Sequence, residues 1–585
     1  MRYLRMLSNS FAASVLATSY ILILILQLNP TLPLNPVRLA PLATTVGLFY
    51  AVHLTAICYV LLVIRQLFAR ELFSPAWISV GVLVWFGALA SGGGATLMWA
   101  NFFTFARVLD RPTAESIMDG SLVLSAASLL FLLLAFARRG IGAEARAVWA
   151  LLLVIIATSS VVVPMAFRGR GNRSILETRP LDASLDVTPA ERSARVTLIA
   201  LDAGSLDFIT TATIEGRLPN FGRVLDAGAF MHLATLHPTS SDAVWAAVAT
   251  GKLPQKNGVR SGGIYGLSAG REVDEIIQLL PEYCFARRLV RFGFLVEEPH
   301  TSATFRTRTL WGILSTHGLS VGVVGWPLTQ PAPAVRGYLV SDMFHRLALT
   351  PSGFVDSSAV YPPDIQAGAS LALEQTLRES TPATLTGGPT DIRQEEPGRI
   401  DRAYDRIGRE LAAAHPAQVT SMRFQSLDPI GHYFLRYAQP SEFGDVSDDE
   451  RRRLGSVLER HYGIVDEAIG HAIASLGAED LLLVVSGFGM EPIGLGRRLV
   501  ERVIGDPELS GTHDNAPDGF LLAYGAPVVR GRLATRASLV DVVPTILYFL
   551  GLPVGRDMDG YARTDLFQSS FTEERPITFI PTYDR

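Results

Sequence analysis

Long apolar stretches fill the first 170 residues of the chain, whereas the remainder alternates between short apolar and polar runs. Five of these stretches approach the roughly 20 apolar residues that a helix needs to cross a bilayer. They run from Phe11 to Leu28, Leu42 to Ile64, Trp77 to Trp99, Ser121 to Ala137 and Val148 to Ala166. The pattern therefore predicts five transmembrane helices within residues 1–166.

From residue 194 onward, short runs rich in β-branched residues alternate with amphipathic segments. The runs at Val196–Leu201, Ser320–Trp326, Val419–Phe424 and Leu481–Val485 are typical of buried strands. Helices are expected at Asn220–Leu225, Val244–Thr250, Leu310–Thr316, Arg452–Ser475 and Ser538–Leu550. Alternation of this kind predicts an α/β domain with a mostly parallel sheet that helices cover on both faces.

Residues 167–193 are polar, contain arginine and proline, and show no apolar periodicity. We interpret them as a linker between membrane helices at 1–166 and a globular domain at 194–585. Within that domain, the stretch from Arg260 to Arg308 interrupts the alternation of strands and helices. Insertions at strand ends often line substrate pockets, so this stretch is either a wall of the site or a surface excursion.

Composition narrows the class of protein. Charged residues make up 18% of the 585 residues, against about 25% in a typical soluble protein, which excludes a disordered regulator and a simple cytosolic enzyme. The net charge is −4 although the first 170 residues are positively charged, so the globular part is acidic. An acidic domain argues against nucleic acid as a partner. Two distant cysteines, Cys58 and Cys284, provide neither a disulfide framework nor a cysteine metal site.

Arginines in the loops between the apolar stretches predict the orientation. Seven fall on the side of the amino terminus: Arg2, Arg5, Arg65, Arg70, Arg138, Arg139 and Arg146. Three, at Arg38, Arg107 and Arg111, fall on the other side. Because basic loops stay in the cytoplasm, we expect a multi-pass protein of the plasma (inner) membrane whose C-terminal domain is extracytoplasmic. Arg168, Arg170 and Arg173 lie on the predicted outer side and oppose this assignment.

Polar residues stand where the predicted strands end. Asp202 follows one strand, and Asp428 and His432 follow another. Ser241 comes just before an apolar helix, and His513 precedes the turn Pro517-Asp518-Gly519. In parallel sheets the ligand site lies at the carboxyl ends of the strands, and aspartate and histidine together are common metal ligands. Each residue alone has a structural alternative as a turn former, a helix cap, a hydrogen-bonded pair or a surface histidine.

Taken in order, these segments resemble the alkaline phosphatase superfamily, and within it the type I phosphodiesterase/nucleotide pyrophosphatase family. The resemblance covers about Val196 to Ala562 and includes Leu198-Ile-Ala-Leu-Asp202, Thr250-Gly-Lys-Leu-Pro254, Val321-Gly-Val-Val-Gly-Trp-Pro327 and the segment from Leu539 to Pro553, followed by Met558-Asp-Gly560. It implies a phosphoester-cleaving enzyme with two zinc-like ions and a serine or threonine nucleophile. By position, Ser241 would be the nucleophile. One metal would be held by Asp428, His432 and His513, and Asp202 would belong to the second metal site.

The second metal site departs from the family pattern. The family places an Asp-His pair there, whereas this chain has Gly487 and Phe488, neither of which binds zinc. Asp202 and Ser241 alone would hold a divalent ion poorly, because stable sites generally have three or more protein ligands. Glu491 and Asp242 are close enough in sequence to be considered as substitute ligands. Asp342 and His345 are spaced like a metal-binding pair but precede Asp428, against the family order.

Two functions compete at this point. The first is a membrane-anchored phosphoester hydrolase or phosphotransferase that uses one divalent metal, zinc by its ligand types, on a phosphate-ester substrate that could be lipid-linked. The second is a catalytically inactive relative that binds a phosphorylated ligand or an envelope partner. The altered pair at Gly487 and Phe488 favours the second function, and retention of the other site residues favours the first.

Overall fold

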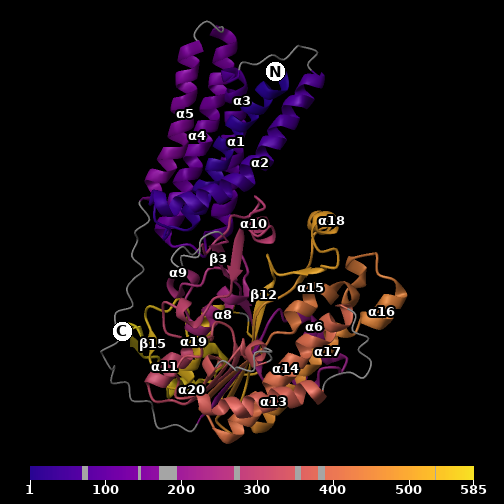
Figure 1. Ribbon diagram of the computed structural model, residues 1–585. Coiled ribbons are helices and arrows are strands. Elements are labelled where there is room, and N and C mark those ends of the chain that lie inside the picture. Colours follow the sequence, from indigo (N-terminus) through magenta and orange to yellow (C-terminus); the bar gives the residue numbers. More distant parts are fainter. Residues whose placement is uncertain are drawn as a thin grey trace. The chain divides into compact units, whose positions relative to one another are not determined.

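The computed structural model describes residues 1–68, 77–141, 146–169, 194–268, 277–348, 357–379, 389–533 and 535–584. Contacts divide the chain into two compact units (Figure 1). Unit 1 comprises Met1–Glu177 and Gly263–Pro299, and unit 2 comprises Thr178–Gly262 and His300–Arg585. The chain thus passes between the units three times. Most of the expected linker at 167–193 lies outside the described residues.

Unit 1 contains five helices long and apolar enough to cross a membrane, which agrees with the number of predicted stretches. They are α1 (Arg2–Leu28), α2 (Pro36–Phe68), α3 (Val80–Phe105), α4 (Arg111–Ile141) and α5 (Arg146–Arg168). Polar contacts join them: the Tyr20 hydroxyl is 2.7 Å from Ser160 Oγ, and Gln27 donates to the carbonyl of Ser116. Interhelical hydrogen bonds of this kind stabilise packing in an apolar solvent.

The segment Gly263–Pro299 lies within the globular half of the sequence but packs on these helices. It forms β3 (Ile264–Leu267), α10 (Arg287–Arg291) and β4 (Leu295–Glu298), with β3 and β4 antiparallel. The Asn29 side chain pairs with the backbone of Leu279, and the Asn101 side chain pairs with the backbone of Glu282. Most of the stretch Arg260–Arg308, where the alternation of strands and helices is interrupted, therefore groups with the apolar helices. The sequence pattern had assigned the whole of 194–585 to one domain.

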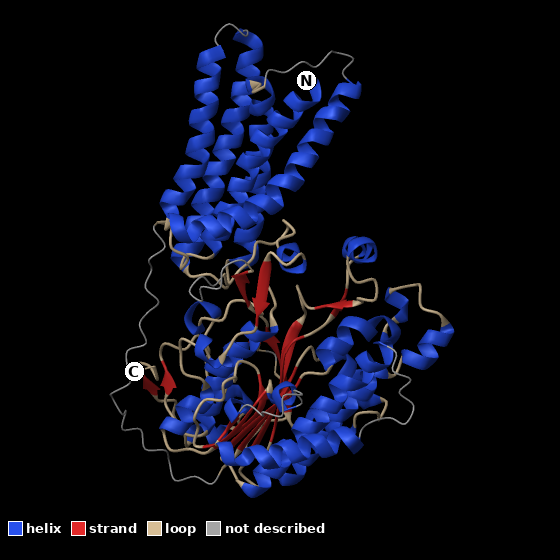
Figure 2. Ribbon diagram, viewed as in Figure 1, coloured by secondary structure: helices blue, strands red, loops and turns tan. Residues whose placement is uncertain are grey.

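Unit 2 is built on one large sheet (Figure 2). Its strand order is β13-β2-β12-β9-β1-β8-β5-β6-β7, with β14 also pairing β2. The central strands β9, β1, β8, β5 and β6 are parallel, and β12 is antiparallel to β9 and β2. The strands are β1 (Val196–Leu201), β2 (Ala229–Ala234), β5 (Val321–Trp326), β6 (Gly337–Ser341), β7 (Val360–Tyr361), β8 (Val419–Phe424), β9 (Leu481–Phe488), β12 (Asp518–Tyr524), β13 (Gly531–Arg532) and β14 (Ala537–Ser538).

Helices cover both faces of the sheet. One apolar core lies between the sheet and the helices on one face, and two lie on the other face. One face packs against α8 (Ser241–Thr250), α11 (Leu310–Thr316) and α19 (Val542–Phe549). The other packs against α6 (Leu206–Ile214), α7 (Pro219–Ala227), α13 (Gln366–Glu379), α14 (Pro389–Ala414), α15 (Leu427–Ala438) and α17 (Val457–Ser475). Because the central strands of the sheet are buried on both faces, their sequences are nearly continuous apolar runs.

Smaller elements complete the unit. They are α9 (Pro254–Asn257), α12 (Phe344–Ala348), α16 (Asp448–Leu454), α18 (Leu495–Ile504), α20 (Ser569–Glu573), β10 (Glu491–Pro492), β11 (Gly511–Thr512), β15 (Val554–Gly555) and β16 (Phe579–Ile580). The single helix expected at Arg452–Ser475 is two helices, α16 and α17. Gly455 ends α16, and a Cβ there would lie 2.5 Å from the Arg451 carbonyl oxygen.

Candidate metal and phosphoester site

Three side chains that the sequence placed in one metal site lie together in the structure. Asp428 and His432 are four residues apart on α15, so they occupy the same face of that helix. His513 follows β11 and comes from a distant part of the sequence. One ligand atom from each of the three residues lies within 4.8 Å of the others. The Nε2 atoms of both histidines are 3.6 Å from Asp428 Oδ1.

These atoms fit a shared divalent ion. At 3.6 Å they are too far apart to hydrogen-bond, and Asp428 Oδ1 is buried with no hydrogen-bond partner. Two ligands about 2.0–2.1 Å from a tetrahedral zinc ion are roughly 3.4 Å apart, which is close to the observed separation. His432 Nδ1 is 2.8 Å from the Gly511 carbonyl oxygen, to which it can donate, leaving Nε2 as the ligand atom. Burial lowers the pKa of His513, which favours the neutral ring that metals bind.

Asp202 is not in this group and pairs with Arg423 instead. The register of β1 and β8 sets Ala200 beside Arg423, so the guanidinium reaches the carboxylate that follows β1. Both Asp202 oxygens accept from Arg423, with Nε 3.0 Å from Oδ1, and the Trp245 indole also donates to Oδ1. Asp202 is 2% exposed, and the Arg423 side chain is 10% exposed. This is a buried, bidentate ion pair.

Arg423 also lies beside Ser241. Its Nη2 atom is 3.4 Å from Ser241 Oγ, and Ser241 is the first residue of α8. The carboxylates of Asp342 and Asp242 interact with the same guanidinium. Burial opposes the charge of Arg423, but the carboxylates around it outweigh this effect and keep its pKa above the ordinary value. A permanent positive charge therefore lies where the expected serine nucleophile begins its helix.

Asp242 is affected differently by the same environment. The pKa of its carboxyl is raised to about 7, chiefly by burial and also by the nearby carboxylates of Asp342 and Asp202, while Arg423 acts in the opposite direction. Its carboxyl is therefore partly protonated at neutral pH, which reduces the negative charge beside Ser241.

No space remains for a side chain at Gly487, the first position of the family's Asp-His pair at the end of β9. A Cβ added to Gly487 would lie 2.3 Å from Val244 Cγ1 of α8, far inside van der Waals contact. Phe488 is fully buried, and its ring centroid is 5.1 Å from that of His513. The altered pair is therefore built into the packing between β9, α8 and the Asp-His-His group.

The other residues considered from the sequence have separate positions. Glu491 begins β10 and is outside the Asp-His-His group. His345 Nδ1 is 3.1 Å from the Tyr404 hydroxyl, whereas Asp342 interacts with Arg423. Asp342 therefore neighbours the site, although its position in the sequence had counted against it.

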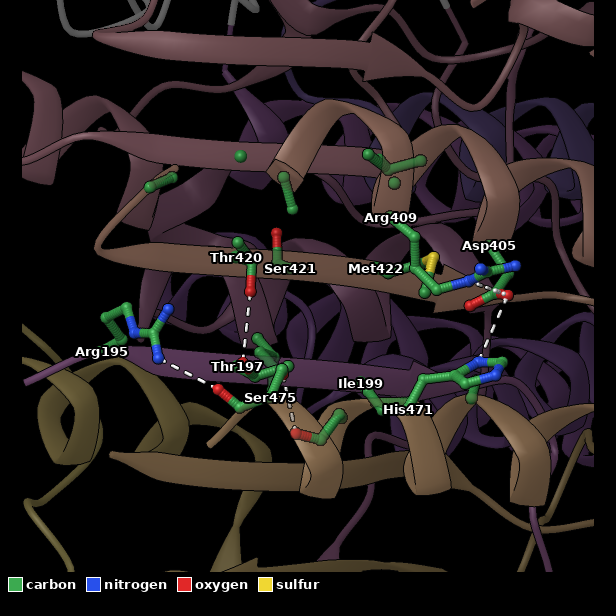
Figure 3. A pocket seen from close by; sticks show the side chains of 18 of the residues that line it. Arg195, Thr197, Ile199, Asp405, Arg409, Thr420, Ser421, Met422, His471 and Ser475 are labelled. Carbon is green, nitrogen blue, oxygen red and sulfur yellow. Dashed lines mark hydrogen bonds and ion pairs between the residues drawn. The ribbon is translucent and has the colours of Figure 1, made fainter. Parts of the chain in front are cut away.

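A cavity of about 360 Å³ lies away from these residues (Figure 3). It opens between strands β1, β5 and β8 and the helices α14 and α17, where small side chains such as Gly408, Ala412 and Ala472 leave space. Arg195 donates to the Ser475 carbonyl at its edge, and Asp405 lies between Arg409 and His471. None of the site residues expected from the sequence lines it.

Fold and site together define an α/β protein with a candidate metal centre near the carboxyl ends of its strands. The chain belongs to the type I phosphodiesterase/nucleotide pyrophosphatase family, whose sequence profile matches residues 196–536. This membership confirms the family resemblance and the alkaline phosphatase-like fold, and it places the chain among phosphoester hydrolases of a family that is metal-dependent.

Solved structures with a similar chain path are distant in sequence. A mutant of the alkaline phosphatase PafA matches 64% of this chain and 98% of its own length at 12% identity, with a TM-score of 0.38. An inactive murine ectonucleotide pyrophosphatase/phosphodiesterase 5 in complex with AMP matches 64% of this chain and 100% of its own length at 12% identity, with a TM-score of 0.37. Among curated proteins, no match was found.

Arg423 is the residue of this site that the sequence did not reveal. It interrupts the run Val419-Thr-Ser-Met-Arg-Phe424 one position before the end of a buried strand. A charge at that position of a buried strand needs a partner. This is the signal that could have identified it.

Proposed function

We propose that the chain is a membrane-anchored phosphoester hydrolase or phosphotransferase with one divalent metal, zinc by its ligand types, and Ser241 as nucleophile. Asp428, His432 and His513 would hold the ion. Their arrangement around the buried, unpaired Asp428 Oδ1 is the observation that carries the proposal. Bound there, the ion would supply Lewis-acid stabilisation of negative charge on phosphoryl oxygen.

Ser241 and Arg423 would carry out the covalent step. The Ser241 oxygen attacks phosphorus, the bond to the leaving oxygen breaks, and a serine phosphoester forms; the hydroxyl proton passes to solvent, and the departing oxygen takes up a proton from solvent and leaves as an alcohol. Water or a second alcohol then attacks this ester and releases Ser241, which gives hydrolysis or transfer respectively. Arg423 donates hydrogen bonds to phosphoryl oxygens beside Ser241, a role that suits the planar guanidinium.

In this proposal Arg423 takes the position of the family's second cation. Asp202, otherwise expected as a ligand of a second metal, would instead orient the guanidinium through two hydrogen bonds. The two halves of the site are electrostatically linked, because the charge of Asp428 acts on Asp202 and the charge of Asp202 acts on His513. One ion and one guanidinium would then flank the phosphoryl group.

The second candidate is a catalytically inactive relative that binds a phosphorylated ligand or an envelope partner. The closed position at Gly487 and the phenylalanine at position 488 favour it, since a carboxylate side chain cannot be accommodated at 487 and a phenyl ring does not bind a metal. A phosphate could still bind between Arg423 and the amino terminus of α8, where backbone N–H groups favour anions.

Metal content and turnover of the purified full-length chain distinguish the two candidates. We expect about one zinc per chain and hydrolysis of bis(p-nitrophenyl) phosphate or p-nitrophenyl phosphate, with Ser241→Ala abolishing turnover but keeping the metal. His432→Ala should lose both, and His415→Ala, an exposed histidine, serves as the matched control. A wild-type chain without metal and without turnover would favour the inactive relative.

The proposed location is the plasma (inner) membrane, with unit 2 outside the cytoplasm. Five apolar helices and the excess of arginine on the amino-terminal side support this orientation. An exposed cysteine introduced as Leu371→Cys should react with an impermeant maleimide added to intact cells. Labelling only after lysis would reverse the orientation.

A further inference from the structure

Helix α18 turns its charged side toward its own domain and its apolar side toward solvent. Leu495, Leu499 and Val503 follow one another at four-residue spacing and are 80%, 65% and 72% exposed. Val500 beside them is also exposed. In a water-soluble domain an amphipathic helix buries its apolar stripe, so α18 has the opposite arrangement.

Contacts on the other side of α18 fix this orientation. Arg497 pairs with Asp514 and donates to Thr512 Oγ1 at 3.0 Å. The Arg498 guanidinium lies 4.4 Å from the centre of the Phe443 ring. Because its arginines are engaged by the domain, α18 cannot rotate its apolar row inward without breaking these contacts.

The apolar row is a cluster and not a set of scattered residues. Elsewhere in the described part of unit 2, strongly exposed apolar side chains such as Ile214 and Leu371 are the only ones on their helices. Single exposed residues need no explanation, whereas a contiguous group marks a contact surface.

We propose that the apolar face of α18, formed by Leu495, Leu499, Val500 and Val503, lies in the surface of the lipid bilayer that holds unit 1. The chain carries five apolar helices and passes between the two units three times, so unit 2 is tethered to that bilayer. A stable protein partner usually buries about 800 Å² on each side, more than four side chains on three helical turns offer. A shallow lipid contact uses a row of this size.

The position of α18 in the chain links this contact to the candidate site. Helix α18 (Figure 1) lies in the connection between β10 and β11, and these two strands pair with each other. His513 follows β11, and the Gly511 carbonyl accepts from His432. A bilayer contact at α18 would hold this end of the site at the depth of lipid headgroups. The substrate class, which rests on the proposed function, is then a phosphoester whose alcohol is a membrane lipid.

Accessibility of position 499 tests the bilayer contact without any measurement of activity. The full-length chain carries Cys58→Ser with Leu499→Cys, is labelled with a nitroxide and is placed in nanodiscs of phosphatidylethanolamine and phosphatidylglycerol. We expect strong relaxation by oxygen and weak relaxation by a water-soluble nickel chelate at position 499, and the reverse at Leu371→Cys, the matched helical control. Equal exposure of both positions to nickel would overturn the contact. Exclusion of both reagents would also overturn it, because it would indicate a protein partner or a second copy.

Activity on two substrates tests the substrate class. For Leu499→Ser with Val503→Ser, we expect headgroup release from vesicles of the same lipids to fall about tenfold through KM, while hydrolysis of soluble bis(p-nitrophenyl) phosphate stays unchanged. Leu371→Ser should change neither. Equal loss on both substrates, or no loss on vesicles, would overturn the lipid assignment. If the wild type cleaves neither substrate, the proposed function and the substrate class both fail, whereas the nitroxide result still decides the bilayer contact.

Discussion

Replacing Arg423 with methionine removes the buried cation while keeping a side chain of similar length. The substitution leaves Asp202, which is 2% exposed, without its bidentate partner. Removing one partner of a buried ion pair costs about 3–5 kcal/mol, so Arg423→Met should strongly lower the melting temperature of the globular unit. Arg378→Met, which breaks an exposed ion pair with Glu374, should cost at most about 1 kcal/mol and is the control.

A double variant separates stability from chemistry. Arg423→Met with Asp202→Asn removes both charges and keeps an acceptor for the Trp245 indole, so most of the lost stability should return. Turnover should not return, because losing one donor that stabilises developing charge typically costs about 10²–10³-fold in rate. Thermal unfolding, zinc content and hydrolysis of bis(p-nitrophenyl) phosphate are measured on all variants. Wild-type turnover in Arg423→Met, or full recovery of turnover in the double variant, would refute a role of the guanidinium in the reaction.

Three further outcomes are expected. Gly487→Asp with Phe488→His should not raise turnover and should lower stability, because overpacking against Val244 costs about 1–3 kcal/mol; faster turnover in that variant would contradict the closed-site explanation. Dialysis against a chelator should abolish hydrolysis, and added zinc should restore it in the wild type but not in His432→Ala; a chelator-resistant rate would rule out the metal. Burial raises the pKa of Asp401 from its ordinary value to about 6, so this carboxyl favours folding at low pH and loses that contribution as the pH rises through about 4 to 6. The melting temperature of the wild type relative to Asp401→Asn should therefore fall over that range, and a constant difference would refute the shift.

Local spacing explains which parts of the site were predictable from the sequence. Asp428 and His432 are four residues apart on an amphipathic segment, which places them on one face of a helix. Val196–Leu201 and Val419–Phe424 match β1 and β8 residue for residue, because strands buried on both faces read as unbroken apolar runs. The position of Asp202 after β1 follows directly from that strand's end.

Contacts between distant segments explain what the sequence did not reveal. The pairing of Asp202 with Arg423 depends on the register of β1 and β8, which are more than 200 residues apart in the chain. Likewise, the packing of residues 263–299 on the apolar helices depends on Asn29 and Asn101, whose hydrogen bonds span 181 residues or more. Neither pairing has a periodic signature, so hydrophobic patterns could not predict it.

Two departures from the family's second metal site, the glycine at position 487 and the pairing of Asp202 with Arg423, depend on each other. Gly487 lets α8 approach β9, since any Cβ there would meet Val244. That approach holds Trp245 and Ser241 of α8 against the Asp202–Arg423 pair. A side chain restored at Gly487 would have to displace Val244 of α8, and the Asp202–Arg423 pair would still remain, so no single reversion can recreate the two-ion site. A chain that had merely lost a ligand would retain an open, solvated pocket, whereas here a fixed positive charge occupies the place beside Ser241. This arrangement is expected if a guanidinium has replaced the second cation.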